Sequence, residues 1–185
     1  MRPGQREEIL DYVTWGEQRE QALPAILAAK QLRRIHVGDE LTFLFENHDT
    51  VRYQIQEMVR VERMVKEADI QHEISTYNEM LGADGGFGCA LLIEIDDPEV
   101  RSRRLAELVG LPSKLYLRFE DGSRVYASFD ARQVGDDRLS SVQYLRFDAG
   151  GRVPVAVGAD HPALQAEAEL TAEQREAFAA DLSDG

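Results

Sequence analysis

The chain has 185 residues, with 34 acidic and 21 basic side chains and a formal net charge of −13, so it can bury one sizeable core but should bind neither nucleic acid nor an anionic membrane. Its single cysteine, Cys89, excludes an internal disulfide and a cysteine-based zinc site, and we expect a buried structural thiol. No apolar run approaches the roughly 18 residues of a membrane span and the N-terminus lacks a signal-peptide core, so we expect a cytoplasmic protein.

We predict a single domain in which a helical N-terminal segment, residues 1–33, precedes an α+β core formed by residues 34–185. Gly16 and Pro24 are expected to divide the N-terminal helix into two pieces, because proline lacks the amide hydrogen that a helix interior needs. The segment ends in three nearby bases, Lys30, Arg33 and Arg34. This basic cluster could hold one anion, or it could pair with acids of the helices that follow.

The stretch Val51–Leu81 is the most informative, because it reads as two consecutive helices with acids on faces that should be buried. Apolar side chains recur along the first helix at helical spacing, at Val51, Ile55, Met58 and Val65. Glu62 projects from the middle of this stripe. Burying an unpaired carboxylate costs several kcal/mol. We therefore predict that Glu62 is largely buried and paired with a base from the basic cluster or with groups near Arg63.

Turn and cap residues suggest where the next elements begin and end. Asp49 and Asp69 are predicted N-caps of the two helices, with a break between them at residues 66–68. The glycine-rich residues 82–88 are predicted to be a linker, with a mobile lid as the alternative. Asp97-Pro98 predicts the start of another helix, which Gly110 ends.

The rest of the chain is predicted to form short strands and one terminal helix. Alternating runs bounded by turn residues indicate strands at 34–37, 41–46, 89–95, 114–119, 124–129, 141–147, 153–157 and 165–170. A T-x-x-Q capping box at 171–174 starts the terminal helix. These patterns predict an α+β fold, with a mainly antiparallel sheet built from hairpins and helices packed on one face.

Several side chains of this pattern could bind a divalent metal or handle protons. Asp69 and His72 have the carboxylate-x-x-histidine spacing found in helical di-metal sites, with Glu73 adjacent. Asp160-His161, before a proline, is a second candidate pair between two predicted strands. The structural alternatives are a helix cap at Asp69 and a turn at residues 160–162. No complete catalytic or nucleotide-binding motif is present, so the sequence leaves enzymatic activity undecided.

The chain resembles the uncharacterised bacterial family called domain of unknown function 3501. The resemblance rests on YQIQEM at 53–58, R-x-E-R at 60–63 and a late Asp-His-Pro at 160–162, which follow the family's order over nearly the whole chain. Members of that family are often encoded beside a rubrerythrin-like protein and a cysteine-rich iron–sulfur protein. The resemblance thus implies a redox partner of one of these kinds. It also marks, without roles, Gln54, Gln56, Glu57, Arg60, Glu62, Tyr77, Asn78, Asp160 and His161.

Three hypotheses follow. The first is an accessory protein that binds a redox partner or small ligand in an oxidative-stress system. Its predicted binding residues are Tyr53, Gln56, Glu57, Arg60, Glu62, Tyr77 and Asn78. The second is a metal-binding protein or enzyme with a pocket between the central helices, formed by Glu57, Glu62, His72, Glu73 and His161. The third is a module that forms homo-oligomers through its apolar helices.

Overall fold

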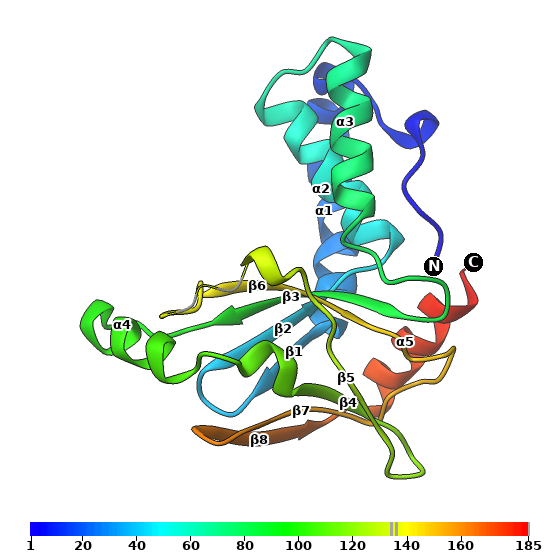
Figure 1. The fold of residues 1–185 in the computed structure, drawn as a ribbon. Coiled ribbons are helices and arrows are strands. Elements are labelled where there is room, and N and C mark those ends of the chain that lie inside the picture. Colours follow the sequence, from blue (N-terminus) through cyan, green and yellow to red (C-terminus); the bar gives the residue numbers. More distant parts are fainter. Residues whose placement is uncertain (134, 136, 185) are drawn as a thin grey trace.

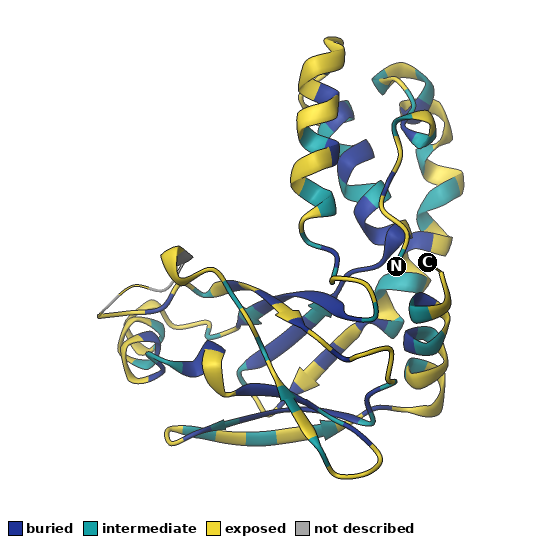
Figure 2. Cartoon of the chain, turned by 45° about the vertical axis from the view of Figure 1, so that its right-hand side comes forward, coloured by how far each residue is buried: buried dark blue, intermediate teal, exposed yellow. Residues whose placement is uncertain are grey.

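A computed structural model of the chain describes residues 1–133, 135 and 137–184, and it shows a helical arm that rises from one end of a pair of β-sheets (Figure 1). The arm contains α1 (Tyr12–Leu32), α2 (His48–Val61) and α3 (Glu67–Asn78), preceded by the short 3-10 helix η1 (Arg6–Glu8). The arm and the sheets each enclose their own cluster of buried apolar side chains, visible as dark blue segments in Figure 2.

Helix α1 begins directly after its N-cap, Asp11, and continues without interruption to Leu32. The Asp11 side chain accepts hydrogen bonds from the amides of Val13 and Thr14, both at 3.0 Å. The predicted division at Gly16 and Pro24 is wrong, because one helix spans both residues. Packing along α2 holds α1 together and offsets the single amide hydrogen bond that proline removes.

Helix α2 begins one residue after Asn47. Asn47 and Thr50 form a reciprocal capping box, so the predicted cap at Asp49 is wrong and Asp49 lies in the first turn. The inner face of α2 consists of fully buried apolar side chains, Val51, Ile55 and Val59. Helix α3 begins at Glu67 without a side-chain cap, which places Asp69 inside its first turn and corrects the second predicted cap.

The prediction that Glu62 is buried is wrong. Helix α2 ends at Val61, and Glu62 is an exposed residue at its C-terminus. Arg63 then adopts a left-handed conformation with φ of 49°, which turns the chain away from the helix axis. The apolar spacing therefore stops before Val65, whose residue surface is 78% exposed. No glycine or proline marks this helix end, so periodicity alone overextends the helix.

The eight strands of the described chain form two four-stranded antiparallel sheets, which confirms the α+β class. Sheet 1 has the order β1-β2-β3-β6, with bounds Arg34–Val37, Leu41–Phe45, Phe87–Ile93 and Val142–Phe147. Sheet 2 has the order β5-β4-β7-β8, with bounds Arg124–Tyr126, Leu115–Arg118, Ala156–His161 and Leu164–Glu169. The remaining elements are α4 (Pro98–Glu107), η2 (Leu111–Lys114), η3 (Ala131–Gln133) and α5 (Ala172–Ser183).

The core lies between the two sheets and is closed at the arm end by α5. Alternation along β6 sends Leu145 and Phe147 inward and Tyr144 and Arg146 outward. From α5, Phe178 inserts its ring between neighbouring core rings, with centroids 4.9 Å from Phe45 and 5.0 Å from Phe87. The predicted caps of α4 at Asp97 and of α5 at Thr171 are both confirmed.

A buried ion pair fixes the base of the arm to α5. The Arg33 guanidinium donates to both carboxylate oxygens of Asp181, at 2.6 and 2.8 Å, and both side chains are more than nine-tenths buried. The Asn47 amide donates to the same carboxylate at 3.0 Å. The basic cluster therefore uses Arg33 for Asp181, whereas Glu62 is out of its reach in the exposed turn after α2.

The glycine-rich residues 82–88 form a tight connection between α3 and β3. A Cβ atom at Gly88 would lie 1.7 Å from the carbonyl oxygen of Met80, and a Cβ atom at Gly82 would lie 2.4 Å from the amide nitrogen of Phe87. Side chains at these positions would collide with backbone atoms, which explains the glycines. Within the described residues, no helix is long and apolar enough to cross a membrane.

Candidate functional site

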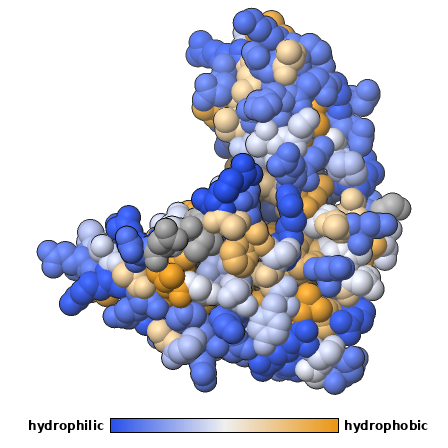
Figure 3. Space-filling view, viewed as in Figure 1, coloured by the Kyte–Doolittle hydropathy of each residue, from blue (hydrophilic) through white to orange (hydrophobic). Residues whose placement is uncertain are grey.

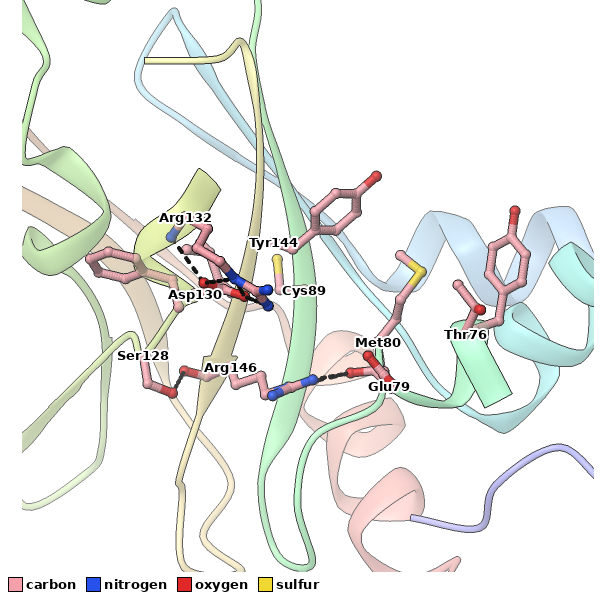
Figure 4. Close-up of a pocket in the computed structure, with 12 residues that line it drawn as sticks. Thr76, Glu79, Met80, Cys89, Ser128, Asp130, Arg132, Tyr144 and Arg146 are labelled. Atoms are coloured by element: carbon pink, nitrogen blue, oxygen red, sulfur yellow. Dashed lines mark hydrogen bonds and ion pairs between the residues drawn. The ribbon is translucent and has the colours of Figure 1, made fainter. Parts of the chain in front are cut away.

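A large hollow lies at the inner angle between the arm and sheet 1, where the surface in Figure 3 is notched. We call it the arm–sheet groove; its volume is about 1080 Å³. Residues from four separate parts of the chain line it: Thr76, Tyr77, Glu79, Met80, Cys89, Ser128, Phe129, Asp130, Arg132, Tyr144, Leu145 and Arg146. Figure 4 shows that the arm supplies one wall, β6 and β3 the floor, and the residues before and within η3 the other wall.

The arm wall is held to sheet 1 through the backbone of Glu79 and Met80. The Arg146 guanidinium donates to the carbonyl oxygen of Glu79 at 2.7 Å, as the dashed line in Figure 4 shows. The close approach of the Met80 carbonyl to Gly88 holds the next residue against β3. The Met80 side chain is half-buried and remains at the groove.

The opposite wall is attached to the edge strand of sheet 1. Ser128 and Arg146 form an isolated β-bridge, with two backbone hydrogen bonds of 2.8 Å. Asp130 and Arg132 form an exposed ion pair beside it. Between the walls, Tyr144 projects outward from β6 and is 55% exposed, so a large aromatic surface faces solvent inside the groove.

The groove floor offers no charged nucleophile. Burial raises the pKa of the Cys89 thiol well above its ordinary value, so this confirmed buried cysteine is protonated at neutral pH. Close to it, burial also raises the pKa of Glu46, although the Thr50 hydroxyl, Lys30 and Arg33 partly oppose that effect. In both groups burial disfavours the charged form.

Glu57, a predicted binding residue, is fully engaged elsewhere on the arm. Its carboxylate accepts hydrogen bonds from the Trp15 indole at 2.8 Å, from Arg19 at 3.0 Å and from Arg60 at 3.1 Å. Burial alone would raise the pKa of Glu57, but these hydrogen bonds outweigh it and lower the pKa to about 2. The network ties α1 to α2, and it also accounts for Arg60, another predicted binding residue.

Two predicted binding residues, Gln56 and Asn78, clamp the N-terminal segment onto the arm. The Gln56 amide accepts from the Leu10 nitrogen and donates to the Leu10 carbonyl, both at 2.8 Å. Asn78 makes the same pair of contacts with Gly4, at 2.8 and 3.0 Å. Each side-chain amide therefore pairs with the backbone N–H and C=O of one residue, as a neighbouring strand would, which is a structural role.

Tyr53 and Tyr77 complete the set of predicted binding residues. The Lys30 ammonium lies 4.6 Å from the centroid of the Tyr53 ring, and the Trp15 ring packs against the same ring edge-on. Tyr53 thus belongs to the α1–α2 contact. Tyr77 is the one predicted binding residue that lines the arm–sheet groove within the described part of the chain.

The metal candidates lie in two separate places. Glu62, Asp69, His72 and Glu73 line a shallow hollow of about 500 Å³ at the tip of the arm. Asp160 and His161 are the last residues of β7 in sheet 2, so the prediction that they lie between two strands is wrong. The structure therefore does not place His161 in one pocket with the helical acids. Among the described residues, no group of three or more histidine, cysteine, aspartate and glutamate side chains could hold a metal ion.

Both ring nitrogens of His161, the last residue of β7, already form hydrogen bonds. Its Nδ1 accepts a hydrogen bond from the Ala163 amide at 3.2 Å, so Nε2 carries the proton and donates to the Val109 carbonyl at 3.1 Å. Asp160 accepts from the Tyr126 hydroxyl at 2.6 Å. These contacts stabilise the end of sheet 2.

Sequence reasoning missed most of the groove. Met80, Phe129, Tyr144 and Arg146 carry no recognisable motif, and they come from segments up to 66 positions apart, between residues 80 and 146. One signal was available: alternation in the predicted strand 141–147 places Tyr144 and Arg146 on the same face. An aromatic residue on the polar face of a strand is a weak indication of a binding surface.

Comparisons with known proteins agree with the resemblance seen in the sequence. The sequence model of the family described as "Protein of unknown function (DUF3501)" matches residues 5–182. A crystal structure of a novel protein of unknown function from Burkholderia pseudomallei K96243 is similar over 97% of each chain, with 29% sequence identity and a TM-score of 0.83. No curated protein matches the chain.

Proposed function

The chain belongs to the DUF3501 family of proteins of unknown function, and we propose that it is an accessory protein that binds a partner protein in the arm–sheet groove. One observation carries the proposal. The groove combines a large volume with an exposed aromatic side chain, Tyr144, whereas the acids that suggested a ligand pocket are occupied inside the arm or lie at its tip. Exposed aromatic surface in a groove is typical of interaction sites.

The chemistry of the groove favours a protein segment over a small reactive substrate. Met80, Phe129 and Leu145 line the groove together with Tyr144, and burial disfavours the charged forms of the neighbouring Cys89 and Glu46. Such a lining can accept apolar side chains of a partner, with the fixed Arg146 at the rim available to polar groups. Shape and apolar burial would then supply the affinity.

The partner class comes from the family resemblance. It implies a rubrerythrin-like protein or an iron–sulfur protein, and we propose one of these as the occupant of the groove. The net charge of −13 favours a partner with a basic surface around its apolar docking segment. Opposite charges accelerate encounter, and added salt screens that attraction beyond a Debye length of about 8 Å at 0.15 M.

The test is a calorimetric titration with a rubrerythrin-like protein and with an iron–sulfur protein of the kinds that the resemblance implies, each purified with its metal or cluster bound. We expect a complex with a dissociation constant in the micromolar range or below, and weaker binding at 0.15 M salt than at low salt. Sedimentation of the chain alone, measured in parallel, separates partner binding from homo-oligomers. The proposal would be contradicted if no complex formed at either salt concentration when the proteins were present at about 100-fold above micromolar concentration. A stable homo-oligomer that blocks the groove would also contradict it.

A further inference from the structure

Helix α4 lies at the end of the sheets away from the arm (Figure 1). A second hollow lies between α4 and the chain segment that leads into β6. Its volume is about 470 Å³. Helix α4 contributes residues at positions i, i+3, i+4 and i+7, which form one helix face: Pro98, Arg101, Ser102 and Leu105. The facing wall is a continuous run, residues 138–141, with the sequence Arg-Leu-Ser-Ser.

The two walls are held together by buried leucines. Leu105 and Leu139 are 4% and 1% exposed, and the Leu139 amide donates to the Leu105 carbonyl at 3.1 Å. The segment is also tied to sheet 1, because the Ser141 carbonyl accepts from the Ile93 amide at 2.8 Å. The polar side chains above these contacts are therefore presented from a fixed base.

The polar residues of the described chain that line the hollow are arginines and serines, whose side chains can all donate hydrogen bonds. Two arginines and three serines are among the lining residues, Arg101, Arg138, Ser102, Ser140 and Ser141, and no acidic residue of the described chain lines it. This is unusual in a chain with 34 acids and 21 bases. Nearby, the Asp97 carboxylate accepts from the first amides of α4 and acts as its cap.

Both arginines are positioned by hydrogen bonds to neutral groups of the described chain. One nitrogen of Arg101 donates to the Ile95 carbonyl at 2.9 Å, and one nitrogen of Arg138 donates to the Ser102 hydroxyl at 3.3 Å. Within the described residues, neither guanidinium forms an ion pair with a carboxylate. By contrast, Arg104 on the same helix is paired with Glu40 and Glu107. Arg101 and Arg138 thus keep donors for another anion.

We propose that this hollow binds a small phosphate monoester. Guanidinium groups bind phosphate oxygens through paired, charge-assisted hydrogen bonds, and serine hydroxyls can donate to the remaining oxygens. The volume is larger than a phosphate group needs, which leaves room for a small organic substituent over the leucines. This site is separate from the arm–sheet groove and does not depend on the function proposed for it.

The test is binding of inorganic phosphate and phenyl phosphate to the full chain by calorimetry, at constant ionic strength maintained with chloride. We expect saturable binding, tighter for phenyl phosphate, that weakens at least tenfold in Arg101→Gln and in Arg138→Gln. Arg103→Gln is the matched control, because it removes the same charge from α4 at a residue outside the hollow. We expect this variant to bind as the wild type does.

A second variant keeps the test independent of any change in folding. Ser102→Asp places a carboxylate in the hollow at an exposed position, so it should abolish phosphate binding without changing the melting temperature. Lack of saturable binding to the wild type at 10 mM of either anion would overturn the proposal. Equal weakening by Arg103→Gln and Arg101→Gln would also overturn it, because that result indicates general attraction to the basic helix.

Discussion

The two sides of the arm differ in how much of their surface is covered by other parts of the chain. On the side where α1 meets α2, the Glu57 carboxylate is saturated by three donors and Gln56 is paired with backbone. On the side facing sheet 1, Tyr144 and Met80 line an open groove. The polar residues that are dense in the sequence of α2, such as Gln56 and Glu57, are used in contacts within the arm. Density of polar residues in a helix therefore indicated internal contacts, and the open surface came from scattered residues.

The largest expected effect concerns the ion pair that fixes the arm to α5. Asp181→Ala leaves the Arg33 guanidinium buried without its carboxylate, so we expect a loss of about 3–5 kcal/mol in the free energy of unfolding. Chemical denaturation measures it. The double variant Arg33→Met, Asp181→Leu should recover most of the loss. If Asp181→Ala were as stable as the wild type, the Arg33–Asp181 ion pair would not fix the arm to α5.

A matched pair of substitutions separates the closed network from the exposed tip. Glu57→Gln removes charge-assisted hydrogen bonds to Trp15, Arg19 and Arg60, and should cost about 1–3 kcal/mol. Glu62→Gln changes an exposed side chain and should stay within about 0.5 kcal/mol of the wild type. Denaturant unfolding of both variants measures this contrast. A larger loss of stability in Glu62→Gln than in Glu57→Gln would instead support the prediction that Glu62 is buried and paired.

The same network predicts a dependence on acid. The pKa of Glu57 is lowered from 4.5 to about 2, so its stabilising effect is complete above pH 4.5 and disappears as the pH falls toward 2. The wild type should therefore lose its advantage over Glu57→Gln across that interval. Unfolding curves at several pH values between 2 and 6 measure it. A constant difference between the two proteins would contradict the assignment of the charged form.

Glu46 should show the opposite sign and the smallest effect. Burial raises its pKa, so folding favours the neutral carboxyl, and its contribution is lost as the pH rises through the folded-state value. Glu46→Gln keeps an acceptor for the Thr50 hydroxyl without the charge. We expect this variant to match the wild type near pH 4 and to be slightly more stable at neutral pH. Lower stability at neutral pH would indicate a charged, paired Glu46.

Local sequence signals predicted most of the fold. Alternating runs located the strands of the described chain, although the predicted strand 153–157 shares only two residues with β7. The Asp97-Pro98 and Thr171-x-x-Gln174 patterns located two helix starts, because these signals depend on neighbouring residues. Helix α1 passed through Pro24 because its contact with α2 outweighs the local preference. The C-terminus of α2 was missed because Arg63, rather than a glycine, takes the left-handed conformation.

The candidate site was far less predictable. Only Tyr77 of the predicted binding residues lines the groove, because the groove depends on how the arm is set against sheet 1. That arrangement is fixed by long-range contacts such as Arg33 with Asp181, which are 148 positions apart. The partners of Gln56 and Asn78 are backbone groups of the N-terminal segment, which no side-chain motif can reveal.

The most direct test of the open groove is a titration of the redox partner against two matched variants. Tyr144 and Leu27 are each 55% exposed, but Tyr144 lies in the groove and Leu27 lies on α1 outside it. We expect Tyr144→Ser to weaken partner binding at least tenfold and Leu27→Ser to change it less than twofold, with both variants folded by circular dichroism. Unchanged binding in folded Tyr144→Ser, or an equal loss in both variants, would contradict a binding site in the arm–sheet groove.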